Sequence, residues 1–233
     1  MKISTYEDYV LATENEQDYI LKYNDSFYKV SLEKMKGILP IEDVSLLREI
    51  NDNKIYAVVC LVGICVSLIA YFYCNNYTLI DRGVGFSTVF LLVNIPIHEF
   101  GHIIALKIFY PEAKFKMGFK VVFIYPAFYV DTSYSYMLPK YKRMVVYLAG
   151  NFMNCMFLVV VLIAFPQYLK YCYLVVSNIL INFITIVKSD GYYAMVTLFN
   201  KFNNFKSIRR EYIEDFIRGI IMFLVLSLIS YIF

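Results

Sequence analysis

The sequence predicts an all-α polytopic membrane protein of about five spans, with a short re-entrant or interfacial β-hairpin and a small α+β N-terminal module. Hydrophobic residues make up 60% of the 233 residues and charged residues only 18%, against about 45–50% and about 25% in soluble domains. The apolar residues gather in long runs after residue 54. We therefore expect a cytosolic module at 1–54 and a membrane domain at 55–233, with a core at 84–198.

The module at 1–54 is predicted to contain a hairpin and a short helix. Two β-prone runs, Asp18–Tyr23 and Ser26–Ser31, flank an Asn-Asp pair, which is typical of a two-residue turn. Apolar residues at positions 44, 46, 47 and 50 favour a helix over Ile41–Ile50. A generic cytosolic cap and a peptide-binding role are equally compatible with this pattern.

Five apolar runs follow the module as candidate spans. The first run has 20 residues and no charge, which is enough to cross about 30 Å of hydrocarbon. The second and fourth runs carry charged or ionisable residues. In chain order the runs are Ile55–Cys74, Val84–Phe109, Met144–Phe165, Cys172–Leu198 and Phe216–Phe233.

A shorter run at Gly118–Val130 is β-branched and aromatic and is interrupted by Pro126. It is too short to span a bilayer, so we expect a hairpin covered by protein or lining a water-filled cavity. One edge of this hairpin could pair with an extended peptide, with Tyr125, Phe128 and Tyr129 forming an apolar wall. A scaffold strand that only seals the cavity is the alternative.

Lysine and arginine placement predicts a multi-pass cell-membrane protein with a cytosolic N-terminus. With that orientation the inside loops carry eleven of these residues and the outside loops two. The topology places His98, His102 and Asp190 at similar depth in the inward half. The inside residues are Lys114, Lys116, Lys120, Lys140, Lys142, Arg143, Lys201, Lys206, Arg209, Arg210 and Arg218, and the outside ones are Arg82 and Lys170.

Charge and cysteine content exclude two classes of protein. The net charge is +3 and no dense basic stripe is present, so we expect no nucleic-acid partner. The five cysteines form no CxxC pair and indicate apolar thiols rather than a disulfide or metal framework.

The run His98-Glu-Phe-Gly-His102 is an HExxH motif on a predicted helix, and it holds both histidines of the chain. Residues four apart lie on one helical face, so both imidazoles can reach one metal ion. Glu99 lies beside them and can accept a proton from the attacking water. A central charge in a span costs roughly 2.5–3.5 kcal/mol, so such groups indicate a function. A polar pair that joins helices is the alternative.

A catalytic zinc needs three protein ligands and an open position. Asp190 is the best third ligand, because it lies in an apolar run at the depth of the histidines and precedes Gly191, which permits close backbone approach. Asp131 after the hairpin is the second candidate, or else an ordinary turn aspartate. Asp81 and Asp215 are remote candidates.

These motifs resemble the site-2 protease family of intramembrane zinc metalloproteases. The family's Gly-Pro-x-x-Asn pattern corresponds to Gly150-Asn-Phe-Met-Asn154, without the proline. Its Asn-x-x-Pro and Leu-Asp-Gly motifs correspond to Asn182 and Asp190-Gly191, with Thr185 and Ser189 replacing proline and leucine.

A bacterial branch of that family, described as peptide zinc metalloproteases, is more similar still. Its motifs correspond to Lys188-Ser-Asp-Gly-Tyr-Tyr193 and Pro126-Ala-Phe-Tyr-Val-Asp131. Some members carry an N-terminal module similar to the leader-recognition domains of peptide maturation pathways, and residues 1–54 resemble a reduced version.

The resemblance implies one Zn²⁺ held by His98, His102 and Asp190, with Glu99 as general base. It also implies that Asn154 and Asn182 assist near the substrate or the oxyanion. Hydrogen bonding between helices, typically worth about 0.6 kcal/mol in membranes, is an equally good interpretation of both asparagines.

The sequence thus favours a protease that hydrolyses a peptide bond in a membrane-associated or precursor peptide, or in a single-span protein. Its expected partners are the lipid bilayer and components of peptide maturation or export. The alternative is a non-catalytic membrane partner, such as an immunity or export component that retains a structural zinc site. A metal transporter is disfavoured, because no second ligand relay follows the spans.

Overall fold

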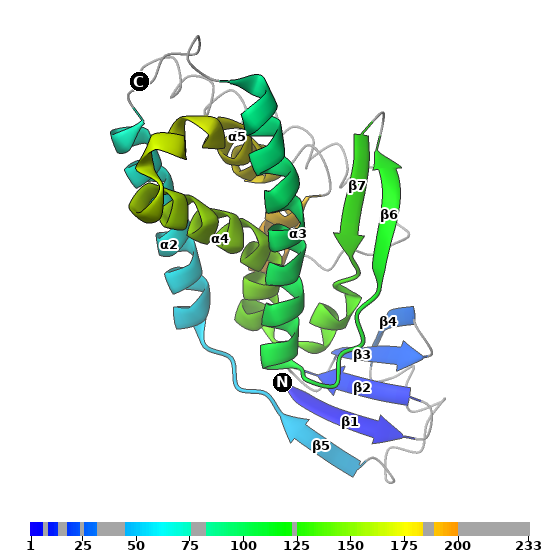
Figure 1. Cartoon of the computed structure of the whole chain (residues 1–233). Helices are drawn as coiled ribbons and strands as arrows, with labels where there is room; N and C mark the ends of the chain where they lie inside the picture. The colour runs from blue at the N-terminus through cyan, green and yellow to red at the C-terminus, as the bar shows by residue number, and fades with distance from the viewer. Residues whose placement is uncertain are drawn as a thin grey trace.

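The computed structural model describes most of the chain and gives a mostly helical molecule with a small N-terminal antiparallel sheet (Figure 1). Within the described part there are five α-helices, a five-stranded sheet and a separate two-stranded hairpin. The predicted fifth span, Phe216–Phe233, lies outside the described residues. Those residues are 1–6, 9–13, 18–23, 26–31, 45–75, 83–122, 125–183 and 189–199.

The N-terminal sheet is wholly antiparallel and has the order β4-β3-β2-β1-β5. The predicted hairpin is confirmed, because β3 pairs with β4 and Tyr23 lies opposite Ser26. The strands are β1 (Lys2–Tyr6), β2 (Tyr9–Thr13), β3 (Asp18–Tyr23), β4 (Ser26–Ser31) and β5 (Ser45–Glu49).

The predicted helix at Ile41–Ile50 is wrong over its described part, where β5 pairs with β1. An apolar pattern this short fits a helix or a strand, and a neighbouring strand edge decides between them. The edge of β1 opposite β2 is filled by β5, which satisfies backbone groups that would otherwise lack partners.

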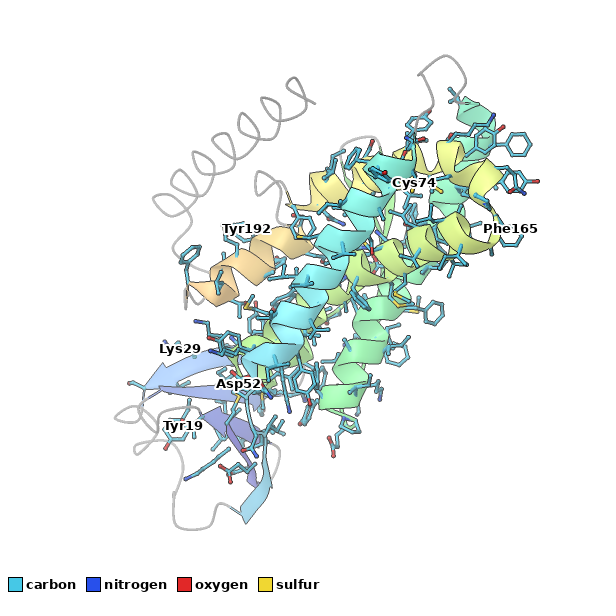
Figure 2. The ribbon with its side chains drawn as sticks, turned by 90° about the vertical axis from the view of Figure 1, so that its left-hand side faces the viewer. Tyr19, Lys29, Asp52, Cys74, Phe165 and Tyr192 are labelled. Atoms are coloured by element: carbon cyan, nitrogen blue, oxygen red, sulfur yellow. The ribbon has the colours of Figure 1, made fainter. Side chains whose placement is uncertain are left out.

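One face of the sheet packs against the ends of the helices. The buried side chains of this face belong to one hydrophobic cluster with Leu106, which lies near the end of helix α3 (Val84–Phe109). They are Ile3, Ala12, Ile20 and Ile50. Asp52 joins the two parts, since its Oδ2 accepts a hydrogen bond from the Tyr141 N–H at 3.1 Å. Figure 2 shows Asp52 at this junction, with Cys74 and Phe165 at the far end of the helices.

Three described helices are long and apolar enough to cross a membrane. They are α2 (Lys54–Cys74), α3 (Val84–Phe109) and α4 (Lys140–Ala164). The first two match the predicted runs within one residue, and α4 begins four residues before its predicted start at Met144. Asn53 caps α2 by accepting a hydrogen bond from the Ile55 N–H at 2.9 Å. All five cysteines are free thiols.

The fourth predicted span, Cys172–Leu198, is not one continuous helix. The 3₁₀ segment η4 (Pro166–Cys172) leads into α5 (Tyr173–Phe183), and α6 (Asp190–Leu198) starts separately. Ser189, just before α6, has extended backbone angles, φ −94° and ψ 176°. Its hydroxyl donates to the Asn182 carbonyl at 2.7 Å. At 11 and 9 residues, α5 and α6 are each too short to cross the hydrocarbon alone.

At this break, the first residues of α6 pack against the last residues of α5. A Cβ on Gly191 would meet the carbonyl oxygen of Asn182 and the Cα of Phe183. The start of α6 therefore lies directly against the end of α5. The prediction that Gly191 permits a close backbone approach is confirmed.

The predicted hairpin at Gly118–Val130 is confirmed as β6 (Met117–Val122) paired antiparallel with β7 (Tyr125–Val130). Figure 1 shows β7 between β6 and α3. The Asp131 N–H donates to the Lys116 carbonyl, so alternate residues from Asp131 back along β7 face β6. Pro126 falls on the other edge, where its missing N–H breaks no ladder bond.

A short 3₁₀ segment, η3 (Ser133–Met137), connects the hairpin to α4. Arg143 in the first turn of α4 is buried and donates hydrogen bonds to the carbonyls of Ser135, Tyr136 and Leu138 at 2.8–3.1 Å. These hydrogen bonds pair the guanidinium cation and hold η3 against the start of α4.

Candidate metal centre

α3 carries the HExxH motif on its buried stripe. The buried residues of this helix include Asn94, His98, Gly101, His102 and Ala105, and their spacing of three and four residues forms one face. His98 is 7% exposed and His102 is 3% exposed. The face packs against α4, which runs antiparallel to α3. The predicted histidine pair therefore points into the protein.

The carboxylate of Asp190 completes the cluster from the first position of α6. Asp190 Oδ2 lies 2.8 Å from His98 Nε2 and 3.3 Å from His102 Nε2. The two Nε2 atoms are 3.2 Å apart. The structure thus brings together three side chains that are up to 92 residues apart in sequence.

The tautomer of His102 is set by the backbone of α4. Its Nδ1–H donates to the Val146 carbonyl oxygen at 2.7 Å. A proton on Nδ1 leaves the lone pair on Nε2 directed at Asp190 and His98. Histidine ligands of metals usually donate their second ring N–H in this way.

Asn154 of α4 contacts the other histidine. Its Nδ2 lies 3.0 Å from His98 Nδ1, while its Oδ1 is buried without a hydrogen-bond partner among the described residues. Exchanging the amide oxygen and nitrogen lets Oδ1 accept from a protonated Nδ1, and amide orientation is set by such networks. In that arrangement the His98 Nε2 lone pair also faces Asp190.

Gly150 of α4 lies directly against the imidazole rings of His98 and His102. A Cβ built on it would lie 2.5 Å from His98 Nε2 and 2.6 Å from His102 Nε2. No side chain fits at this position of α4 without displacing the rings. The two imidazoles therefore depend on a glycine from the neighbouring helix.

Glu99, the predicted general base, is held by the hairpin. Its Oε2 accepts a hydrogen bond from the backbone N–H of Val130 at 2.8 Å. Val130 is the last residue of β7, and this N–H lies on the edge that does not pair with β6. The carboxylate is thus oriented beside the ligand cluster rather than exposed in a loop.

The cluster fits a metal ion by its donor chemistry. One ligand atom from each of His98, His102 and Asp190 lies within 4.8 Å of the others. Two imidazole nitrogens and one carboxylate oxygen form the kind of three-ligand set that catalytic zinc uses, with a fourth position open. Both rings have outer partners that direct Nε2 inward, and Gly150 clears the space.

The other predicted ligand candidates do not join the cluster. Asp131 Oδ1 accepts hydrogen bonds from the N–H and the hydroxyl of Ser133 at 2.9 and 2.5 Å, which is a local turn at the start of η3. Asp81 and Asp215 lie outside the described residues.

The predicted substrate residues are placed as follows. Asn182 donates from Nδ2 to Asn151 Oδ1 at 3.3 Å, a bond between α5 and α4. The Tyr129 ring lies over Gly118 across the hairpin. Tyr125 pairs through its backbone with Val122, and its side chain lies outside the described part. A role for Asn154, Asn182, Tyr125 or Tyr129 toward substrate stays a prediction.

Three functional contacts were missed by sequence reasoning. The Val146 carbonyl and the Val130 N–H are backbone groups, which every residue carries, so no residue type marks them. Gly150 belongs to the predicted family pattern, but its position under the imidazoles depends on the packing of α3 on α4.

Comparison with known proteins agrees with this site. The chain is 29% identical over 232 residues to a Bacillus subtilis (strain 168) protein named "Putative peptide zinc metalloprotease protein YydH", covering 89% of this chain and 88% of the relative. No family model and no solved structure matches the chain. The similarity to this relative supports a zinc metalloprotease family for the chain.

Proposed function

We propose that this chain is an intramembrane zinc metalloendopeptidase of the site-2 protease type, which hydrolyses a peptide bond in a membrane-associated or precursor peptide. The observation that carries the proposal is the convergence of His98, His102 and Asp190 beside Glu99. A structural zinc site is usually closed by four protein ligands, whereas the described residues supply three to this cluster.

Each residue has a distinct role in the proposed reaction. His98, His102 and Asp190 would hold Zn²⁺, which when bound polarises the scissile carbonyl and makes water more acidic. Glu99 accepts the proton of the attacking water and passes it to the leaving amine. The Val130 N–H keeps the Glu99 carboxylate directed at the cluster during both transfers.

The location within a membrane is supported by the helices around the site. α2, α3 and α4 are each long and apolar enough to span, and large apolar side chains of α2 face outward, for example Ile69 at 67% exposure. In water such a surface would be costly, but in lipid it is ordinary. The excess of lysine and arginine in the predicted inside loops supports a cytosolic N-terminus in the plasma membrane.

A peptide substrate is supported by two observations. The relative carries the words peptide zinc metalloprotease in its name. Strand β7 pairs with β6 along one edge only, and its other edge faces α3 (Figure 1). An extended peptide that pairs there would present its backbone to Glu99 and the metal ligands. Components of peptide maturation or export are the partners that this activity implies.

The test uses purified full-length protein in lipid nanodiscs with Zn²⁺ and a panel of short membrane-associated precursor peptides. Glu99→Gln is expected to bind zinc normally and to lose cleavage, since general-base removal costs about 10²–10⁴-fold. His98→Ala is expected to lose both zinc and cleavage. Normal cleavage by the Glu99→Gln protein would overturn the proposal. Zinc binding without cleavage by the wild type would favour the non-catalytic membrane partner.

A further inference from the structure

Ser189 immediately precedes Asp190, and its side chain does not cap the helix that follows it. A serine at this position usually accepts a hydrogen bond from a backbone N–H of the first helical turn. Within the described part of α6, no such bond is formed. The hydroxyl instead donates to the carbonyl oxygen of Asn182 at 2.7 Å, seven residues earlier and near the end of α5. This hydrogen bond therefore ties the start of α6 to α5.

The same carbonyl group is approached from the other side of Asp190. A Cβ built on Gly191 would meet the Asn182 carbonyl oxygen and would lie 2.8 Å from the Cα of Phe183. The residues before and after Asp190 thus both lie against one backbone carbonyl of α5. Because the Cα of Asp190 is covalently placed by these two neighbours, the Asn182 carbonyl determines the point from which the Asp190 carboxylate extends.

Asn182 is itself held by α4. Its Nδ2 donates to Oδ1 of Asn151 at 3.3 Å, and Asn151 is 0% exposed. Asn151 directly follows Gly150, which lies against the imidazole rings of the two histidines. Consecutive residues of α4 therefore contact the histidine pair and hold the segment that carries the third ligand.

Asp190 depends on such an anchor more than the histidines do. Its side chain is 24% exposed, whereas those of His98 and His102 are 9% and 4% exposed, so packing encloses it less. Asp190 is also the first residue of α6, where the backbone N–H groups have no partner within the helix. A bond from the preceding residue to α5 supplies a restraint that the helix itself does not.

We propose that Ser189 is a positioning residue for the metal centre, which sets where the Asp190 carboxylate lies relative to His98 and His102. The inference rests on the proposed zinc site. It acts through Asn182 and Asn151, and it accounts for the distances of 2.8 Å and 3.3 Å from Asp190 Oδ2 to the two Nε2 atoms. The site-2 protease pattern has leucine in place of Ser189, and a leucine side chain forms no hydrogen bond, so this role belongs to the residues of this chain.

Zinc affinity of the full chain in lipid nanodiscs, measured by chelator competition, is the first test. Ser189→Ala removes the hydroxyl and is expected to weaken zinc binding about 10-fold, the lower end of the effects of outer partners. Ser189→Thr keeps a hydroxyl on a residue that favours extended backbone, and it is expected to bind zinc as the wild type does. Wild-type affinity in Ser189→Ala, or equal losses in both variants, would overturn the proposal.

Co²⁺ in place of zinc gives a second readout, because its visible absorption depends on the number and arrangement of its ligands. Ser189→Ala saturated with Co²⁺ is expected to show a shifted and weaker band, and Ser189→Thr the wild-type band. Ser177→Ala is the matched control, since it removes the same atoms from a hydroxyl that donates to the Tyr173 carbonyl of α5 at 2.8 Å. This control is expected to keep the wild-type band. A wild-type band in Ser189→Ala would contradict the positioning role.

Asn151→Ala interrupts the same path at α4 and provides an independent variant. It is expected to weaken zinc binding by a similar factor. If both residues act through Asn182, the double variant Ser189→Ala with Asn151→Ala loses no more affinity than the weaker-binding single variant, because coupled sites are not additive. Multiplication of the two single losses would overturn the path. These measurements need no peptide, so their failure is distinct from that of the proposed function, which a wild-type chain unable to bind zinc would refute.

Discussion

The Oε2 atom of Glu99 and the backbone nitrogen of Val130 are 2.8 Å apart, and the N–H donates to the carboxylate. This bond joins α3 to the last residue of β7 and so couples the predicted general base to the hairpin. Because β7 uses its other edge to pair with β6, the Val130 N–H is free to donate to Glu99.

Replacing Val130 by proline is therefore expected to slow peptide cleavage while zinc content stays at the wild-type level. Proline removes the N–H that holds Glu99, but it breaks no bond to β6 at this edge position. Misplacing a catalytic group by about 1 Å can cost about 10²-fold in rate. Turnover and zinc stoichiometry of the purified protein are the measurements.

Val130→Ala is the control, since it shortens the buried side chain and keeps the N–H. We expect its turnover to stay close to that of the wild type. Equal turnover numbers for the proline and alanine proteins would show that the hydrogen bond does not position Glu99.

Substituting Gly150 with alanine is expected to weaken zinc binding by at least about 100-fold, the upper end of outer-partner effects. The new Cβ would meet both imidazoles at 2.5–2.6 Å, so the rings must move. The helix itself gains from the change, since alanine is favoured over glycine by about 1 kcal/mol. Zinc affinity by chelator competition and helix content by circular dichroism separate the two effects.

Gly85→Ala provides the comparison, because a Cβ there has nothing within 4 Å. Because Gly85 is the second residue of α3, the change is expected to alter helix stability little and to leave zinc affinity unchanged. A Gly150→Ala protein with wild-type affinity would mean that the rings do not depend on this gap.

The features predicted correctly from sequence depend on strong local patterns. The runs that became α2, α3 and α4 are long and uniformly apolar, and the HExxH spacing brings His98 and His102 to one face. Asp190 is predicted as the third ligand from its place in an apolar run at the depth of the histidines, before Gly191, and its carboxylate contacts both histidines.

The features that sequence reasoning missed depend on contacts between distant segments. β5 is a strand because the edge of β1 lies beside it, although its short apolar pattern also fits a helix. The run from Cys172 to Leu198 has spanning length, yet it breaks at Ser189 and α6 packs on the end of α5. Hydropathy cannot distinguish a continuous span from two short helices covered by their neighbours.

The link between Asn154 and His98 predicts different outcomes for two substitutions. Asn154→Leu removes the acceptor for His98 Nδ1–H and is expected to lower zinc affinity by about 10–100-fold. Asn154→Asp supplies a carboxylate acceptor in the same place and is expected to retain zinc binding. Chelator competition on both proteins is the measurement, and equal losses in the two would indicate a packing defect instead.

The choice of third ligand is tested by comparing two aspartates. Asp190 Oδ2 lies within 3.3 Å of both histidine Nε2 atoms, so Asp190→Ala leaves two protein ligands and is expected to abolish stoichiometric zinc binding. Asp131 Oδ1 is occupied by Ser133, so Asp131→Ala is expected to keep one zinc per chain and to lower the thermal midpoint slightly through loss of the turn. The measurement is the zinc content per chain of both proteins after dialysis. If Asp131→Ala lost zinc and Asp190→Ala kept it, the third ligand would be Asp131 at the end of the hairpin, because two imidazoles alone do not complete a catalytic site.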